Sequence, residues 1–142
     1  MNEYLYKNIY IGQEEKFCVE ITNEKVEIFR KLSGDENPLH TDADYARKKG
    51  YQNKIVYGML IGSYLSTLAG MYMPGKFSLI HSVQIDFHAP VYVKEKETLQ
   101  VKGKVTKKND LFKIISVKYT IENHQGKQVC KGNLEIGVID GK

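Results

Sequence analysis

Asp35 and His40 lie five positions apart in the segment "SGDENPLHTD", residues 33–42, and could do acid/base chemistry. A carboxylate beside an imidazole can hold a water molecule between them, so that one group accepts its proton while the other orients the water or later donates a proton. The competing interpretation is a helix cap followed by a turn, with an aspartate that bonds nearby backbone and a histidine that only satisfies local hydrogen bonds. Residue type and spacing alone leave both interpretations open.

The backbone between these two residues is predicted to reverse direction. On a continuous helix, residues five apart would point about 140° away from each other. Gly34 permits a left-handed exit from a helix, Pro38 disfavours helical backbone at Asn37, and the asparagine side chain can hydrogen-bond nearby backbone. We therefore expect a sharp bend that lets both side chains face one cavity.

A metal site is a weaker alternative for the same acidic residues. The candidate ligands are Asp35, His40, Asp42 and Asp44. Their spacing matches no standard zinc or calcium motif, so no metal is expected.

Two helices are predicted to flank the bend. Thr22 can cap a helix that runs through Leu32 and ends near Gly34. The apolar face of this helix consists of Val26, Phe29 and Leu32. A shorter helix is expected over residues 43–49, capped by Thr41 or Asp42 and closed by Gly50.

A stretch without charged residues runs from Ile55 to Gly75 and is predicted to be a buried helix. Nine of the nineteen residues 55–73 are Gly, Ser, Thr or Tyr, which insert poorly into a bilayer, so a membrane span is rejected. Small residues recur every four positions, at Gly58, Gly62, Ser66 and Gly70. Such a stripe lets a strand or a thin ligand approach closely, and core packing alone explains it equally well.

The second half of the chain alternates apolar and polar residues in four runs, which predicts strands. One run contains Val83, Ile85 and Phe87, and residues 107–110 and 123–127 are predicted as hairpin turns. An early strand with Phe17 and Val19 completes a sheet of about five strands. The predicted fold class is α+β, a single domain over residues 1–142 in which a curved antiparallel sheet wraps around a central helix.

Composition narrows the functional class only slightly. The net charge of +4 comes from scattered lysines, which is weak evidence for nucleic acid and fits a phosphate-bearing ligand equally well. Cys18 and Cys130 are far apart, and the amino terminus does not resemble a signal peptide. We expect a cytoplasmic protein with buried free thiols.

The stretch "FRKLSGDENPLHTDADYARKKGY", followed by "IVYGML", resembles the signature of the MaoC-like hydratases and dehydratases. That signature reads F-x3-S-G-D-x-N-P-x-H-x-D, then A-x4-[FY], then I-x-H-G-M-L. The matching residues are Phe29, Ser33, Gly34, Asp35, Asn37, Pro38, His40, Asp42, Ala46, Tyr51, Ile55, Gly58, Met59 and Leu60. The resemblance covers nearly the whole chain and implies a hot-dog fold. Tyr57 departs from the signature, because the family usually has histidine there.

The resemblance implies reversible, (R)-specific addition of water across the 2,3 double bond of an enoyl thioester. Asp35 and His40 would be the acid/base pair, and the backbone N–H of Gly58 would bind the thioester oxygen as it gains negative charge. A helix amino terminus suits this role, because it carries free N–H donors and partial positive charge. A tyrosine rather than a histidine at position 57 need not remove the main-chain N–H donor of Gly58, although the tyrosine could change the geometry of that donor or the shape of the pocket.

Two further residues acquire supporting roles by the same resemblance. Asn37 would lie beside the reacting water, and Ser63 would help to hold the catalytic aspartate. The alternatives are a plain turn former and a helix hydroxyl that bonds its own helix backbone. The remaining histidines, which match no signature position and are treated as structural, are His81, His88 and His124.

The resemblance also implies the partners. The acyl group would arrive on coenzyme A or on an acyl carrier protein, with no separate cofactor, and the protein would be a homodimer or a higher homo-oligomer. Binding of nucleic acid or membrane is not expected. Two other functions stay open: a hot-dog acyl thioesterase, and a non-catalytic module that binds acyl thioesters, which Tyr57 keeps possible.

Overall fold

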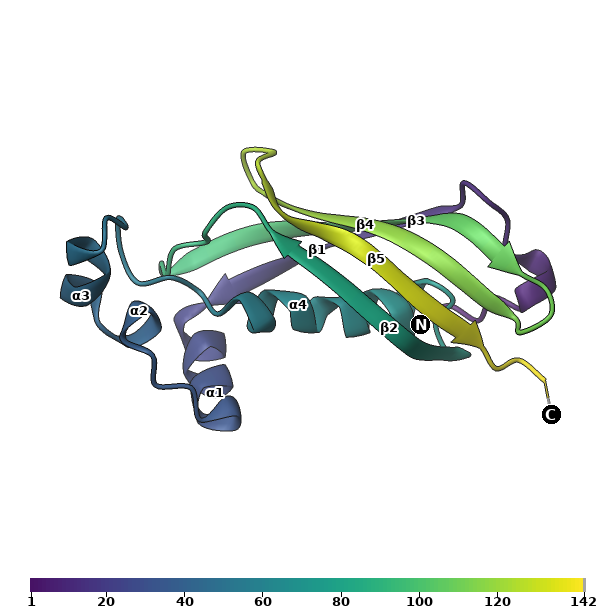
Figure 1. Cartoon of the computed structure of the whole chain (residues 1–142), viewed down its shortest axis with the longest axis horizontal. Coiled ribbons are helices and arrows are strands. Elements are labelled where there is room, and N and C mark those ends of the chain that lie inside the picture. The colour runs from purple at the N-terminus through teal and green to yellow at the C-terminus, as the bar shows by residue number, and fades with distance from the viewer. Residues whose placement is uncertain (142) are drawn as a thin grey trace.

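The computed structural model describes residues 1–141 and consists of one antiparallel sheet with helices on one face and at one end (Figure 1). The strands are β1 (Glu14–Thr22), β2 (Ser78–Phe87), β3 (Lys96–Asn109), β4 (Ile114–Asn123) and β5 (Gln128–Val138). The helices are η1 (Tyr6–Asn8), α1 (Asn23–Ser33), α2 (Pro38–Thr41), α3 (Ala43–Lys48), α4 (Gly58–Thr67) and η2 (Leu68–Tyr72).

The sheet has the strand order β1-β3-β4-β5-β2, and all neighbouring strands are antiparallel. The side chains that alternate toward α4 are fully buried in the middle strands, for example Val101, Val117 and Leu134. The curved sheet around a central helix is therefore confirmed. Figure 1 shows α4 running along the sheet, with α1, α2 and α3 gathered beyond one end of it.

The central helix begins at Gly58 rather than Ile55, because Tyr57 has non-helical backbone and occupies the N-cap position. The glycines of its small-residue stripe face β2. A Cβ atom on Gly58 would lie 2.8 Å from the Phe87 ring, and one on Gly62 would lie 3.0 Å from Ile85. The glycines of the stripe thus let β2 pack closely on the helix, which favours the core-packing interpretation for Gly62, whereas Ser66 is exposed.

The local helix signals around the bend are confirmed. The Thr22 side chain accepts a hydrogen bond from the Lys25 N–H at 3.2 Å, and Gly34 ends α1 in the left-handed region at φ 73°. The predicted apolar face is wrong at Leu32, which is 80% exposed. Because α1 projects away from the sheet (Figure 1), its last turn has no sheet surface to pack against.

Two further expectations need correction in the sheet. The turn between β3 and β4 lies at residues 110–113 rather than 107–110, because β3 continues past a bulge between Val105 and Lys107. Cys18 is exposed, since it alternates with the inward-facing residues of β1. Cys130 is buried as expected, and burial raises the pKa of its thiol to about 11.

The strand β2 is more exposed than its apolar alternation predicted. It forms one edge of the sheet, and Val83 and Phe87 are 46% and 53% exposed. An edge strand has a neighbouring strand on one side only, so these side chains lack the cover that the middle strands have. Among residues 1–141, no helix is long and apolar enough to cross a membrane.

Candidate active site

The bend between α1 and α2 is built from local side-chain hydrogen bonds. One carboxylate oxygen of Asp35 accepts from the Asn37 N–H at 2.9 Å, and the Asn37 side chain caps α2 by accepting from the Leu39 N–H at 2.9 Å. Pro38 occupies the first position of α2, where its missing N–H costs nothing. The chain reversal predicted from Gly34, Asn37 and Pro38 is therefore present, and its residues are exposed.

The imidazole of His40 is held by the main chain of the segment that precedes α4. Its Nδ1 lies 2.7 Å from the carbonyl oxygen of Ile55, and the Ile55 N–H donates to the carbonyl of Leu39 at 2.9 Å. A carbonyl oxygen can only accept, so Nδ1 carries the hydrogen of this bond. In the neutral ring Nε2 then has a free lone pair and can act as a base.

Tyr57 contacts both members of the candidate pair. Its hydroxyl donates to the main-chain carbonyl of Asp35 at 2.6 Å, and its ring stacks on His40 with centroids 4.0 Å apart and planes 28° apart. The tyrosine is 2% exposed. Burial, followed by the nearby charges of Asp35 and Glu36, raises the pKa of Tyr57, so its hydroxyl stays protonated and remains a donor.

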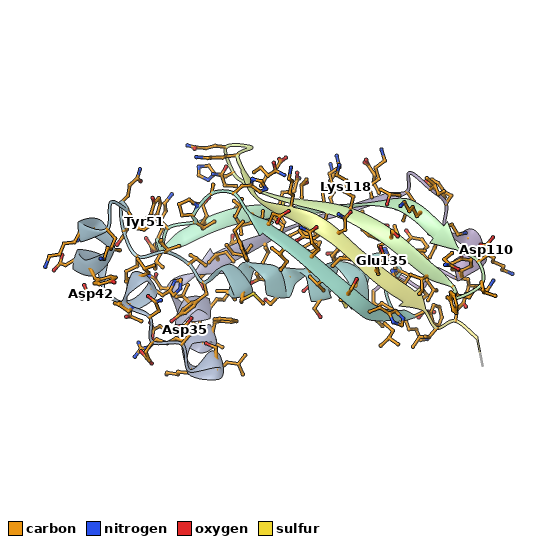
Figure 2. All side chains as sticks on the ribbon, viewed as in Figure 1. Asp35, Asp42, Tyr51, Asp110, Lys118 and Glu135 are labelled. Atoms are coloured by element: carbon orange, nitrogen blue, oxygen red, sulfur yellow. The ribbon has the colours of Figure 1, made fainter. Side chains whose placement is uncertain are left out.

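The structure brings the two candidate groups to one cavity of about 380 Å³. Its lining consists of Phe29, Ser33, Asp35, His40, Tyr57, Gly58, Met59 and Phe87. Figure 2 shows Asp35 at the end of the molecule that carries α1–α3, while Asp110 lies at the opposite end. A second cavity, of about 280 Å³, shares His40, Gly58 and Phe87 and is lined mainly by apolar residues.

The amino end of α4 faces both cavities through Gly58. Within residues 1–141 the N–H of Gly58 forms no hydrogen bond, as expected for the first residue of a helix. The dipole of this ten-residue helix adds partial positive charge at the same point. The site therefore combines a carboxylate, an imidazole with a free nitrogen, and an N–H donor that can bind negative charge.

The other candidate residues of the signature lie outside this group. The Ser63 hydroxyl donates to the Leu60 carbonyl of its own helix at 2.6 Å, which is the local role left open above. Asn37 caps α2 and lines neither cavity. Asp42 caps α3, and Asp44 pairs with Arg47. In the described part of the chain, no three His, Cys, Asp or Glu side chains are placed to hold a metal ion.

Two site residues were missed in the sequence. Phe87 lines both cavities, and His88, treated above as structural, lines the second one with His40. Phe87 ends β2 and His88 follows it, about fifty positions after the bend, and the packing of β2 against α4 brings them there. The available signal was His88 itself, at the end of the alternating run. The sequence does not show, however, which element of the fold this histidine contacts.

Comparison with protein families gives a match to the MaoC-like domain over residues 9–127. The chain is 34% identical over 95 residues to the (R)-specific enoyl-CoA hydratase of Aeromonas caviae, a match that covers 67% of this chain and 71% of that one. It is 31% identical over 121 residues to the mitochondrial 3-hydroxyacyl-[acyl-carrier-protein] dehydratase of Arabidopsis thaliana, covering 85% of this chain and 67% of that one.

Solved structures show the same fold. The unliganded R-hydratase of Pseudomonas aeruginosa superposes with a TM-score of 0.86 at 28% identity, over 96% of this chain and 86% of that one. The (R)-hydratase of A. caviae also has a TM-score of 0.86, at 27% identity, over 93% of this chain and 98% of that one. The fold is therefore the hot-dog fold, and the chain belongs to the MaoC-like family of hydro-lyases.

Proposed function

We propose that the protein catalyses (R)-specific addition of water to 2-enoyl thioesters, or the reverse dehydration of (R)-3-hydroxyacyl thioesters. The observation that carries this proposal is the shared cavity of Asp35, His40 and the amino end of α4 at Gly58. The relatives support it, because both are named as enzymes that add water to, or remove it from, acyl thioesters.

The acid/base pair would act on a water molecule held in the cavity. The His40 Nε2 has a free lone pair when the ring is neutral, and the Asp35 carboxylate has accepting positions left beyond its bond to Asn37. Between them, the two groups remove one proton from the water that attacks C3 and deliver one proton to C2. The enzyme returns to its starting protonation state, and hydration converts one enoyl thioester and one water molecule into one 3-hydroxyacyl thioester.

The N–H of Gly58 would stabilise the charge that develops during this reaction. Attack at C3 moves electron density onto the thioester oxygen until C2 is protonated. A donor aimed at that oxygen typically contributes about 3 to 4 kcal/mol to the transition state. The apolar lining of the adjoining cavity offers a place for the acyl group next to this donor.

The carrier and the assembly are part of the same proposal. The substrate would arrive on coenzyme A or an acyl carrier protein, and the chemistry needs no further cofactor. A homodimer through the β2 edge is supported by the exposed apolar side chains of Leu79, Val83 and Phe87 on that strand. A cytoplasmic location stays a prediction.

The direct test is hydration of crotonyl-CoA, followed by loss of the conjugated enoyl absorbance. We expect activity in the wild type, with (R)-3-hydroxybutyryl-CoA as the product by chiral analysis. Asp35→Asn and His40→Ala should each lower kcat by about 10² to 10⁴-fold, because each removes a proton-transfer group. Asp35 is exposed, so Asp35→Asn should unfold much like the wild type, whereas His40 is half-buried and bonded to the Ile55 carbonyl, so the rate of His40→Ala is compared per folded molecule.

Matched controls come from the same residue types outside the cavity. Asp44→Asn removes an exposed carboxylate on α3, and His81→Ala removes an exposed imidazole on β2; both should keep the wild-type rate. A thiol reagent added to the assay detects release of free coenzyme A, which would identify a thioesterase instead. Full activity in both Asp35→Asn and His40→Ala, or binding of crotonyl-CoA without turnover, contradicts the proposal.

A further inference from the structure

The bend that carries Asp35 is joined to the rest of the molecule by very little. Residues 33–37 are all exposed, and their side-chain hydrogen bonds are with neighbours in the same bend, in α1 or in α2. Within residues 1–141, the hydrogen bond from the Tyr57 hydroxyl to the Asp35 carbonyl is the one that connects residues 33–37 to the chain beyond α2. Its length of 2.6 Å and the burial of Tyr57 indicate a well-formed bond.

The ring of Tyr57 fixes the other candidate group. It lies against His40 on one side, with centroids 4.0 Å apart, and against Phe29 of α1, with centroids 5.1 Å apart. The same residue is the N-cap of α4 and directly precedes Gly58. One buried side chain therefore touches the carboxylate-bearing bend, the imidazole and the helix end that presents the N–H donor.

We infer that Tyr57 is a positioning residue that holds the Asp35 backbone and the His40 ring in register with the amino end of α4. This inference rests on the proposed function of Asp35 and His40. The hydroxyl acts through the Asp35 main chain and the ring acts through His40, so the phenol takes no part in proton transfer. Its protonated state agrees with that role, since only the neutral hydroxyl can donate to a carbonyl.

The chemistry makes this register important. A displacement of about 1 Å in a catalytic group can lower the rate by about a hundredfold, because proton transfer needs close approach and alignment. Without the hydroxyl, the Asp35 bend keeps its internal hydrogen bonds but loses its connection to α4. Substrate would still enter the cavity, whose walls are unchanged, while the carboxylate would spend less time in the reactive position.

The test is the isosteric variant Tyr57→Phe, which removes the hydroxyl and keeps the stacking on His40. We expect kcat for crotonyl-CoA hydration to fall by about tenfold to a hundredfold, with KM changed by less than about threefold. Tyr119→Phe is the matched control, because the Tyr119 hydroxyl is also buried and also donates to a main-chain carbonyl, that of Gln84, at 2.9 Å. That variant should keep the wild-type kcat at a comparable loss of stability.

A double-mutant cycle separates positioning from general loosening of the fold. If the hydroxyl acts through Asp35, then Tyr57→Phe should leave the residual rate of Asp35→Asn unchanged within about twofold. Multiplicative losses in the double variant would mean that the hydroxyl contributes independently of Asp35, and they overturn the inference. A wild-type kcat in Tyr57→Phe overturns it as well.

A second measurement does not depend on activity. Backbone ¹⁵N relaxation of the free protein should show lower order parameters for residues 34–37 in Tyr57→Phe than in the wild type, and no such change in Tyr119→Phe. Unchanged order parameters contradict the inference even if the enzyme is active. An inactive wild type contradicts the proposed function, while the relaxation data still decide whether Tyr57 holds the bend.

Discussion

The sheet body and the helical extension of this protein are stabilised in different ways. The sheet body consists of β1–β5 with α4, and the helical extension consists of α1–α3, residues 23–48 (Figure 1). In the body, whole rows of apolar side chains on β3, β4 and β5 are fully buried. In the extension, only Val26 and Ala46 are buried.

The difference separates the part that stabilises the fold from the part that carries the candidate chemistry. Asp35 and His40 both lie in the extension, where solvent and substrate can reach them. Val26 and Phe29 pack α1 on the core. The bend and α2 are bonded to the chain before α4 at Ile55 and through Tyr57, so a few contacts decide where the acid/base pair lies. We therefore expect substitutions in the body to change stability, and substitutions at these contacts to change activity.

The largest effect is expected for a substitution in the middle of the sheet body. Leu134 of β5 is fully buried and pairs with Val117 and Val83 on the neighbouring strands. Leu134→Ala should lower the free energy of unfolding by about 2 to 5 kcal/mol, because it removes apolar burial and leaves a cavity. Urea unfolding measures this change, and kcat per folded molecule should stay close to the wild type.

The matching substitution in the extension is Leu32→Ala. Leu32 is 80% exposed, so its loss should change the free energy of unfolding by less than about 0.5 kcal/mol. Equal destabilisation by both variants would break the distinction between body and extension. It would mean that the last turn of α1 is covered in solution, for example by a second copy of the chain.

The same division explains how much of the fold could be predicted from the sequence. Helix caps and strand alternation are local signals, so the helix from Thr22 to Gly34 and the five strands were predicted correctly. Exposure depends on what lies opposite a residue in space. Leu32 is apolar but 80% exposed, and Phe87 lies against Gly58 of α4 yet is half-exposed on the edge strand; no local pattern records either.

The candidate site, like the fold, could be predicted only where local signals define it. The bend at Gly34 and Pro38 is local, so the approach of Asp35 and His40 to one cavity followed from the sequence. The bond from Tyr57 to the Asp35 carbonyl joins residues 22 positions apart, and it depends on the direction in which α4 enters the fold. Ser63 shows the limit of a signature position, since the hydroxyl donates to its own helix, the local alternative, and its contact with the aspartate stays a prediction.

A substitution where the body meets the site should have an intermediate effect. Gly58→Ala keeps the N–H donor but adds a Cβ 2.8 Å from the Phe87 ring, which lines both cavities. Because Phe87 is half-exposed, the ring can move aside, and stability should change by less than about 1 kcal/mol. The moved ring reshapes the cavity, so kcat/KM for crotonyl-CoA should fall by about tenfold.

Gly62→Ala is the control for Gly58→Ala. The added Cβ lies on the same helix face, 3.0 Å from Ile85, but residue 62 lines neither cavity. Its kcat/KM should stay within about twofold of the wild type, since any displacement of Ile85 occurs away from the acid/base pair. Similar losses in both variants would show that α4 as a whole shifts, and that the site depends on the packing of β2 more than on Phe87.

The smallest effect, apart from the Leu32→Ala comparison, concerns a charge buried in the body. Among residues 1–141, Glu97 is the one buried charged residue, at 6% exposed, and it bonds His124 at 2.6 Å and Lys94 at 3.0 Å. Burial alone would raise the pKa of Glu97, but the bonds and charges of His124 and Lys94 outweigh it and lower the pKa below its usual value of 4.5.

This lowered pKa gives the pH dependence a definite sign. A carboxylate with a depressed pKa in the folded state stabilises the fold above its unfolded pKa and loses that contribution as the pH falls through its folded pKa. The stability advantage of the wild type over Glu97→Gln should therefore shrink between pH 6 and pH 3, by less than about 1 kcal/mol because Lys94 is half-exposed. Urea unfolding at each pH measures the difference. An advantage that grows on acidification would mean that desolvation of Glu97 outweighs its bonds with His124 and Lys94, so that its pKa is raised rather than lowered in the folded protein.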